Sequence, residues 1–289
     1  MRKRPGRRLP AICLFSAVLL LAAVCFSVWR SYHSLTVTTY RFPTDKAEGP
    51  VRLAVMSDLH EHVFGQDNAP LVEAVAEQRP DLMLNAYSAS SQNSTELVGA
   101  LSKIAPVYYA WGNHELDYLA AGTSLLEEEL VSAGATVLDR AWCDLDIHGT
   151  PLRLGGLYDY AFALDDRNSC DPDRMDPEVC RFLTDFQDTE RFTLMLSHRP
   201  DSFALGEAAR TWSIDLVLSG HAHGGQVVLP VLGGVFGGDL GLFSPYLHGM
   251  CRKDGLTMAV TSGLGSQRER LPRFHNPPEI MVIDLTPES

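Results

Sequence analysis

Two histidines separated by one alanine, His221 and His223, follow directly after an apolar run at residues 214–218. That run predicts a buried strand, and the flanking Gly220 and Gly224 permit tight turns and a close approach to a ligand. The carboxyl end of such a strand is where α/β sheets place their ligand sites. The pair therefore indicates a candidate metal-binding loop, although the motif alone is equally compatible with an ordinary surface loop.

Three further polar clusters follow apolar runs in the same manner. They are Asp58 and His60, Asn113 and His114, and His198, which come after residues 51–56, 106–110 and 192–196. Each cluster has a structural alternative, such as a cap, a tight turn or a buried histidine, but their joint occurrence after strands argues against coincidence. Imidazole, carboxylate and amide oxygen together suit Mn, Fe or Zn better than Ca or Mg. A metal with an open position could activate water for attack on phosphorus.

The elements that must position these clusters alternate between strand and helix patterns. Expected helices cover residues 69–78, 96–104, 123–133 and 177–186, and further strands cover 81–84, 136–138, 152–154, 256–260 and 280–285. The alternation predicts parallel strands joined by crossover helices. We therefore expect an α/β fold with two facing mixed sheets flanked by helices.

The N-terminus differs in composition from the rest of the chain. Residues 1–10 carry five cations, and residues 11–29 carry no charge. At about 1.5 Å per residue, the uncharged run just spans a hydrocarbon core of about 30 Å. The cations before it predict a single-pass membrane anchor with a cytoplasmic N-terminus and an extracytoplasmic body. A cleaved signal peptide is the alternative, but a clean small-x-small cleavage site is missing.

After the anchor, residues 30–50 are expected to form a polar, extended stem with a strand-like pattern at 35–40, and residues 51–289 one domain. Residues 1–30 hold six of the 24 basic residues and none of the 36 acidic ones, so the remainder carries a formal charge of −18. An acidic body disfavours nucleic acid as a partner. Positive charge for a phosphate must then come from a metal or from arginines. Arg268, Arg270 and Arg273 are the candidates, with a solvated basic patch as the alternative.

Four cysteines lie beyond the anchor: Cys143, Cys170, Cys180 and Cys251. They form no C-x-x-C motif, so the sequence does not indicate a structural zinc site. Spacing makes Cys170 and Cys180 the best candidates for a disulfide, and unpaired thiols are the alternative.

The polar motifs resemble, in type and order, those of the calcineurin-like metallophosphoesterase superfamily. The motifs are Asp58-Leu59-His60, Gly112-Asn113-His114-Glu115, Ser197-His198-Arg199-Pro200 and Gly220-His221-Ala222-His223. The C-terminal stretch 262–280 is similar to membrane-anchored bacterial members. The resemblance implies a metallophosphatase-like four-layer sandwich over residues 51–289 and a site for two divalent ions. By the same resemblance, Asp58, His60 and His223 would hold one ion and Asn113, His198 and His221 the other. His114 would stabilise the transition state or protonate the leaving oxygen.

This chain departs from the family pattern at one position. The pattern has a Gly-Asp pair after the second strand whose carboxylate bridges the two ions, and here Tyr87-Ser88 stands in its place. Two dications about 3.5 Å apart repel by roughly 19 kcal/mol at an effective dielectric near 20. Without the bridging carboxylate at Ser88, the second ion would have only neutral ligands, so one metal ion is the alternative to two.

Two functions of different classes follow from these observations. The first is a membrane-tethered phosphoesterase that hydrolyses phosphomonoesters or phosphodiesters by metal-activated hydroxide, with lipid-linked or wall-linked substrates suggested by the anchor. The second is a degenerate homologue that binds a phosphorylated ligand or one metal without efficient turnover. A structural envelope protein is a third, weaker alternative. The sequence predicts no protein partner.

Overall fold

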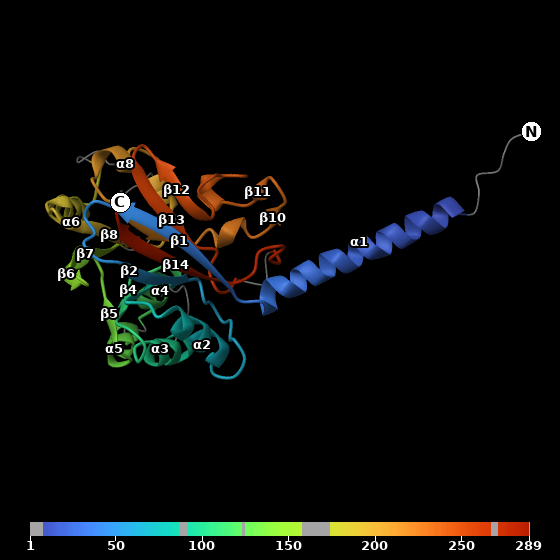
Figure 1. The fold of residues 1–289 in the computed structure, drawn as a ribbon, viewed down its shortest axis with the longest axis horizontal. Helices are drawn as coiled ribbons and strands as arrows, with labels where there is room; N and C mark the ends of the chain where they lie inside the picture. Colours follow the sequence, from blue (N-terminus) through green and yellow to red (C-terminus); the bar gives the residue numbers. More distant parts are fainter. Residues whose placement is uncertain (1–7, 87–91, 123–124, 158–173, 267–270, 289) are drawn as a thin grey trace, which may run out of the picture.

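Two six-stranded sheets form the centre of the computed structural model, which describes residues 8–86, 92–122, 125–157, 174–266 and 271–288 (Figure 1). The first sheet has the order β1-β14-β2-β3-β4-β5, with β2 to β5 parallel, β14 antiparallel to β2, and β1 parallel to β14. Its strands are β1 Thr36–Thr44, β2 Val51–Ser57, β3 Leu82–Ala86, β4 Val107–Tyr109, β5 Ala135–Val137 and β14 Glu279–Pro287.

The second sheet has the order β12-β13-β9-β8-β7-β6. Its four inner strands are parallel, and the two edge strands pair antiparallel with their neighbours. The strands are β6 Ala141–Ile147, β7 Thr150–Leu157, β8 Phe192–Ser197, β9 Leu216–Ser219, β12 Gly249–Lys253 and β13 Leu256–Val260. A small hairpin, β10 Val228–Leu229 with β11 Gly233–Gly234, lies apart from both sheets.

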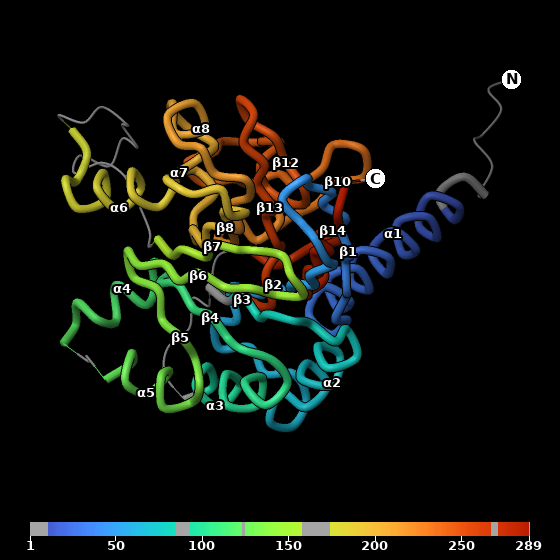
Figure 2. The backbone as a smooth tube through the Cα atoms, turned by 60° about the vertical axis from the view of Figure 1, so that its left-hand side comes forward, coloured from blue at the N-terminus to red at the C-terminus, as the bar shows by residue number. Residues whose placement is uncertain are grey.

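Helices cover the outer faces of the two sheets (Figures 1 and 2). The α-helices are α1 Arg8–His33, α2 Ala69–Gln78, α3 Gln92–Leu101, α4 Asn113–Ala120, α5 Leu126–Ser132, α6 Pro177–Gln187, α7 Asp201–Ala204 and α8 Ala208–Thr211. Two 3-10 turns, η1 His223–Gly225 and η2 Gly238–Leu240, complete the described elements.

Three apolar cores hold these layers together. One lies between the first sheet and α2, α3 and α5, a second lies between the second sheet and α6, α7 and α8, and the third joins the two sheets. In the middle core, buried leucines such as Leu53 of β2 and Leu194 of β8 contribute about 1.5–3 kcal/mol each through removal from water. The order helix, sheet, sheet, helix confirms the predicted fold class.

The sequence patterns located most of these elements. Helix α2 and strand β13 have the predicted bounds, residues 69–78 and 256–260. Residues 30–50, expected as a stem, contain β1, which pairs along its full length with β14 and is an edge strand of the first sheet. Strand β6 was not predicted, although its burial alternates residue by residue. Cys143, Cys180 and Cys251 are free thiols, and Cys170 lies outside the described residues.

Helix α1 is the one long apolar helix of the described chain. Its segment Ala11–His33 has a mean hydropathy of 2.7 for the most apolar window, none of which is buried. In Figure 1 it projects away from the two sheets, with only its C-terminal end against them. Its length and composition fit a membrane anchor or a signal sequence.

Candidate metal centre

The polar clusters meet where strands of both sheets end. Asp58 follows β2 of the first sheet, whereas His198 and His221 follow β8 and β9 of the second. The backbone N–H of Gly220 donates to the carbonyl of His198 (2.9 Å), which ties the last two strand ends together. The facing sheets thus bring residues more than 160 positions apart into one site.

The Asp58 carboxylate is the centre of this site. Its Oδ1 lies 3.7 Å from the Nε2 of His223, 3.7 Å from that of His198 and 3.9 Å from that of His60. The Nε2 atoms of His60 and His223 are 3.3 Å apart. The ligand atoms of Asp58, His60 and His223 therefore lie close to one another, and His198 approaches the same carboxylate oxygen.

The second carboxylate oxygen fixes the orientation of Asp58. Oδ2 accepts hydrogen bonds from the Ser57 hydroxyl (2.6 Å) and from the backbone N–H of His221 (2.8 Å). The side chain is 1% exposed. With Oδ2 occupied by donors, Oδ1 is the oxygen that faces the imidazoles.

The tautomer of His223 follows from its other contact. Its Nδ1 lies 3.1 Å from the carbonyl oxygen of Gly265, which can only accept, so we assign the ring proton to Nδ1. The lone pair on Nε2 then faces Asp58 and His60. A backbone carbonyl that orients an imidazole in this way is typical of histidine metal ligands.

A second group of three side chains adjoins the first. The Oδ1 of Asn113 lies 3.2 Å from His198 Nε2 and 3.2 Å from His221 Nδ1. Asn113 begins α4 directly after β4, so its position depends on the N-terminus of that helix. The structure thus brings together both sets of side chains expected from the sequence, with Asp58 Oδ1 adjacent to each.

Charge and burial give these groups the protonation states that metal ligands need. Burial lowers the pKa of His198, His221 and His223 to about 4, against the opposing pull of Asp58. Burial acts to raise the pKa of Asp58, but the neighbouring imidazoles and the Ser57 hydroxyl outweigh it and hold that pKa far below its usual range. At neutral pH the carboxylate is charged and the imidazoles are neutral, which is the form that binds divalent ions.

The backbone of the site is held in an uncommon conformation. Asp58, His60, His221 and His223 have φ of 52°, 50°, 60° and 46°. Positive φ in a non-glycine residue costs on the order of 1–3 kcal/mol and concentrates at functional sites. The close packing also depends on Gly220, since a Cβ there would lie 2.5 Å from Asp58 Oδ2.

His114 lines an open pocket together with members of the two ligand sets. Its ring packs edge-on against His60, with centroids 5.2 Å apart. The pocket has a volume of about 670 Å³ and its lining includes Asp58, Asn113, His114, Asp117, Gln226, Phe236 and Leu271. A substrate group in this pocket would therefore meet His114 and both ligand sets.

Glu115 supports the site in a way that was not predicted from the sequence. Glu115 is fully buried, accepting from the Tyr109 hydroxyl (2.7 Å) and from the N–H of Gly112 (3.0 Å), and so fixes the turn that carries Asn113. The sequence did contain a signal for this role, because an acidic residue at the third position of a helix commonly accepts a hydrogen bond from the backbone N–H just before the helix.

Arg273 has a different environment from the one expected. Its guanidinium is fully buried and donates to the carbonyl oxygens of Gly265 and Ser262 (both 2.6 Å) and of Asn276 (2.9 Å). These contacts correct the expectation that it touches substrate phosphate, because its donors are engaged by the backbone. Since Gly265 also accepts from His223, Arg273 instead supports a ligand loop. The other two candidates, Arg268 and Arg270, and the Ser88 position lie outside the described residues.

The donor chemistry fits a divalent transition metal. Two imidazoles and one carboxylate form a ligand set that binds such ions. Metal–nitrogen bonds of about 2.0–2.1 Å in tetrahedral geometry separate ligand atoms by about 3.4 Å. The observed 3.3 Å between His60 and His223, with 3.7 and 3.9 Å to Asp58, is close to that spacing. The Asp58, His60 and His223 side chains can therefore converge on one ion.

Comparison with known proteins agrees with this chemistry. Residues 51–225 match the calcineurin-like phosphoesterase family, and because this match covers more than half of the sequence, the chain belongs to that family. Members of this class hydrolyse phosphate esters with the help of divalent metals.

Three curated relatives are 26–28% identical to this chain over the aligned residues. A Helicobacter pylori protein described as an uncharacterized metallophosphoesterase is 27% identical over 85% of this chain, which spans 62% of that relative. Bacillus subtilis YkuE, also described as an uncharacterized metallophosphoesterase, is 26% identical over 81% of the chain and 78% of its own length. Escherichia coli phosphodiesterase YaeI is 28% identical over 65% of the chain and 66% of its own length.

Proposed function

We propose that this chain hydrolyses phosphodiesters or phosphomonoesters at the site centred on Asp58. The observation that supports this most directly is the convergence of three imidazole Nε2 atoms on Asp58 Oδ1 within 3.9 Å. Membership in the metallophosphoesterase family supports the reaction class. The description of the E. coli relative as a phosphodiesterase favours diesters as the first substrates to test.

Each side chain of the site has a proposed task. Asp58, His60 and His223 hold one divalent ion, and Asn113, His198 and His221 hold the second when it is present. A bound ion would lower the pKa of water and neutralise charge on the phosphoryl group. His114, which lines the pocket, donates a proton or a hydrogen bond to the departing oxygen, a role usually worth about 10²–10⁴ in rate. Gly265 and Arg273 keep the His223 imidazole oriented.

We further propose that α1 anchors the protein in the cell membrane and that the phosphoesterase domain lies outside the cytoplasm. The cations before residue 11 and the exposed apolar surface of α1 support this topology. Substrates at a membrane or cell wall, such as lipid-linked phosphate esters, would then be within reach. Protease added to intact cells without an outer barrier should digest the domain, and full protection of the domain would contradict the topology.

The catalytic proposal is tested by hydrolysis of bis(4-nitrophenyl) phosphate with the full chain in detergent and added Mn²⁺. His114→Asn should retain bound metal but lose about 10²–10⁴-fold in kcat. His148→Gln is the matched control, because His148 is a 59% exposed histidine in the β6–β7 turn. Its rate should equal that of the unchanged chain.

Two results would contradict the proposal. A His114→Asn rate equal to that of His148→Gln would remove His114 from the reaction. Metal binding without any hydrolysis above that of Mn²⁺ in buffer would favour the second function, a homologue that binds a metal or a phosphorylated ligand without turnover.

A further inference from the structure

Residues 227–243, here named the apolar loop, expose large apolar side chains beside the site. Val231 is fully exposed, and Leu232 and Leu242 are 63% and 66% exposed. Asp239 is the only charged residue in the whole segment. Several exposed large apolar side chains in one short segment are typical of an interaction surface.

The apolar loop is hydrogen-bonded to the segment 273–276. The N–H of Val228 donates to the carbonyl of Phe274 (2.9 Å), and the N–H of Phe274 donates to the carbonyl of Gln226 (3.2 Å). Asp239 forms an ion pair with the buried Arg199, next to His198. The loop is therefore fixed to the domain at both of its ends.

The same segment holds the C-terminal turns of α1. The backbone N–H groups of Arg273, His275 and Asn276 donate to Tyr32 Oη, Ser27 Oγ and Ser31 Oγ at 3.0, 3.1 and 3.0 Å. One short segment thus joins the apolar loop to the helix, so the two have a defined relative position.

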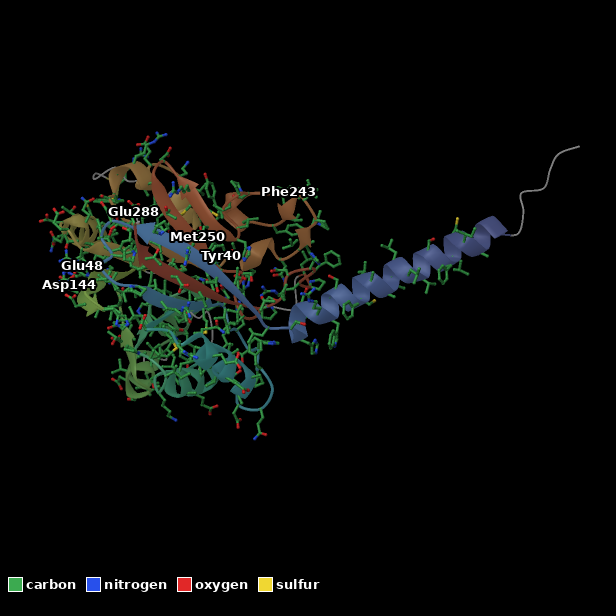
Figure 3. All side chains as sticks on the ribbon, viewed as in Figure 1. Tyr40, Glu48, Asp144, Phe243, Met250 and Glu288 are labelled. Carbon is green, nitrogen blue, oxygen red and sulfur yellow. The ribbon has the colours of Figure 1, made fainter. Side chains whose placement is uncertain are left out.

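The apolar loop and α1 lie on the same side of the domain. Figure 1 shows β10 and β11, and Figure 2 shows β10, on the side from which α1 leaves. In Figure 3, Phe243 lies on that side, whereas the charged residues Glu48 and Asp144 lie on the far side. The end of α1 that contacts the domain includes Trp29 and Arg30, residue types that favour the interface between bilayer and water.

We propose that the apolar loop inserts into the surface of the bilayer that α1 spans and forms a second membrane contact. This inference rests on the proposed role of α1 as an anchor. A bilayer is the partner that fits this loop, because the loop lies beside the emerging helix and contains no Lys or Arg. Its one acidic residue, Asp239, is ion-paired with Arg199. If α1 holds the domain at the interface between bilayer and water, the apolar loop reaches the lipid without any further binding partner.

The contact would also place the pocket at the membrane. Phe236 belongs to the apolar loop and lines the pocket, together with the adjacent Gln226 and with Leu271. Loop insertion would hold this rim at the bilayer surface, where a phosphate ester in the headgroup layer could enter.

Photo-crosslinking to lipid tests the proposal on the full chain. The protein is reconstituted in phosphatidylcholine vesicles that contain a lipid with a diazirine in its acyl chain, irradiated, digested and analysed by mass spectrometry. We expect lipid adducts on peptides from 227–243 at more than ten times the level found on α5 peptides. The α5 region is the matched control, because Leu125 and Val131 are 60% and 53% exposed and Figures 1 and 2 show α5 on the side of the domain away from α1.

A double substitution makes the test specific. Val231→Asp with Leu232→Asp should reduce loop adducts at least tenfold, leave α1 adducts unchanged and leave the thermal unfolding midpoint within about 2 °C. If α1 is labelled but the apolar loop is labelled no more than α5, the loop contact is overturned and the anchor is not. An unlabelled α1 would overturn the anchor, and loop labelling that survives the two aspartates would overturn the assigned contact residues.

Discussion

Asp58 Oδ1 lies 3.7 Å from His198 Nε2, as close as it lies to His223 Nε2. One carboxylate oxygen therefore adjoins both ligand sets, although only the set with His60 and His223 contains it in the expected assignment. This relationship makes Asp58 the residue on which metal binding at either position should depend.

Metal content should separate the two ligand sets. We expect Asp58→Ala and His223→Ala to remove most bound metal, because each deletes a ligand of the set that contains the carboxylate. His198→Ala should retain most of the bound metal, because His198 belongs to the other set, whose ligands are all neutral and are expected to bind an ion more weakly. Elemental analysis of the purified full chain measures the difference, and equal losses in all three variants would mean that the two positions depend on each other.

Ser88→Asp tests the missing bridging carboxylate. Strand β3 ends at Ala86, which pairs with Ser57, the residue before Asp58, and Ser88 follows two positions later in the sequence. A carboxylate there should raise metal content from about one toward about two ions per chain, since it offsets repulsion between dications. Hydrolysis of a phosphodiester should increase with it. If the unchanged chain already binds two ions tightly and reacts as fast, another group supplies the bridge.

Gly220→Ala should damage the site through overpacking. The new Cβ would lie 2.5 Å from Asp58 Oδ2, so the strand end must shift, at a typical cost of about 1–3 kcal/mol in unfolding free energy. Bound metal should fall as well. Gly99→Ala is the matched control, because its Cβ would meet no atom closer than 3.9 Å, and helix α3 should gain about 0.5–1 kcal/mol. Equal melting and metal content in both variants would contradict the account.

The His248–Glu279 pair should give a pH-dependent contribution to stability. Burial acts to lower the pKa of His248, but the hydrogen bonds to Glu279 (3.0 Å) outweigh it and raise that pKa above 6.5. Burial acts to raise the pKa of Glu279, but His248 and the Ser262 N–H lower it below 4.5. The histidine contribution is complete below pH 6.5 and is lost as pH rises through the raised value. The glutamate contribution is complete above pH 4.5 and is lost as pH falls through the lowered value.

The stabilising effect of the pair should therefore be largest between about pH 4.5 and 6.5. His248→Gln should lower the free energy of unfolding there by up to about 1 kcal/mol, a modest figure because the imidazole is 43% exposed. Denaturant unfolding at pH 5.5 and 8.5 measures it. A larger difference at pH 8.5 than at pH 5.5 would refute the assigned charges.

Local patterns were sufficient to predict the layers and the polar clusters at the strand ends, whereas the division of the ligand residues into two sets came from the resemblance to the metallophosphoesterase superfamily. Helix α2 was predicted because apolar residues such as Leu71 and Val75 recur at helical spacing before Pro80. Long-range pairing was harder to infer: nothing near residues 36–44 specifies β14, more than 240 positions away, as their partner. The burial of Arg273 was missed for the same reason, because an arginine in a polar stretch resembles a surface residue until its carbonyl partners are known.

Removal and return of metal tests the central claim most directly. The full chain is treated with EDTA, and hydrolysis of bis(4-nitrophenyl) phosphate is measured before and after addition of Mn²⁺, Fe²⁺ or Zn²⁺. We predict that the rate falls at least about 100-fold on chelation and returns with at least one of these ions. The same additions should not restore Asp58→Asn, because the change removes the negative charge of the carboxylate, which the neutral amide oxygen of asparagine does not replace. A chelated chain that keeps its full rate, or an Asp58→Asn variant restored as well as the unchanged chain, would contradict the account.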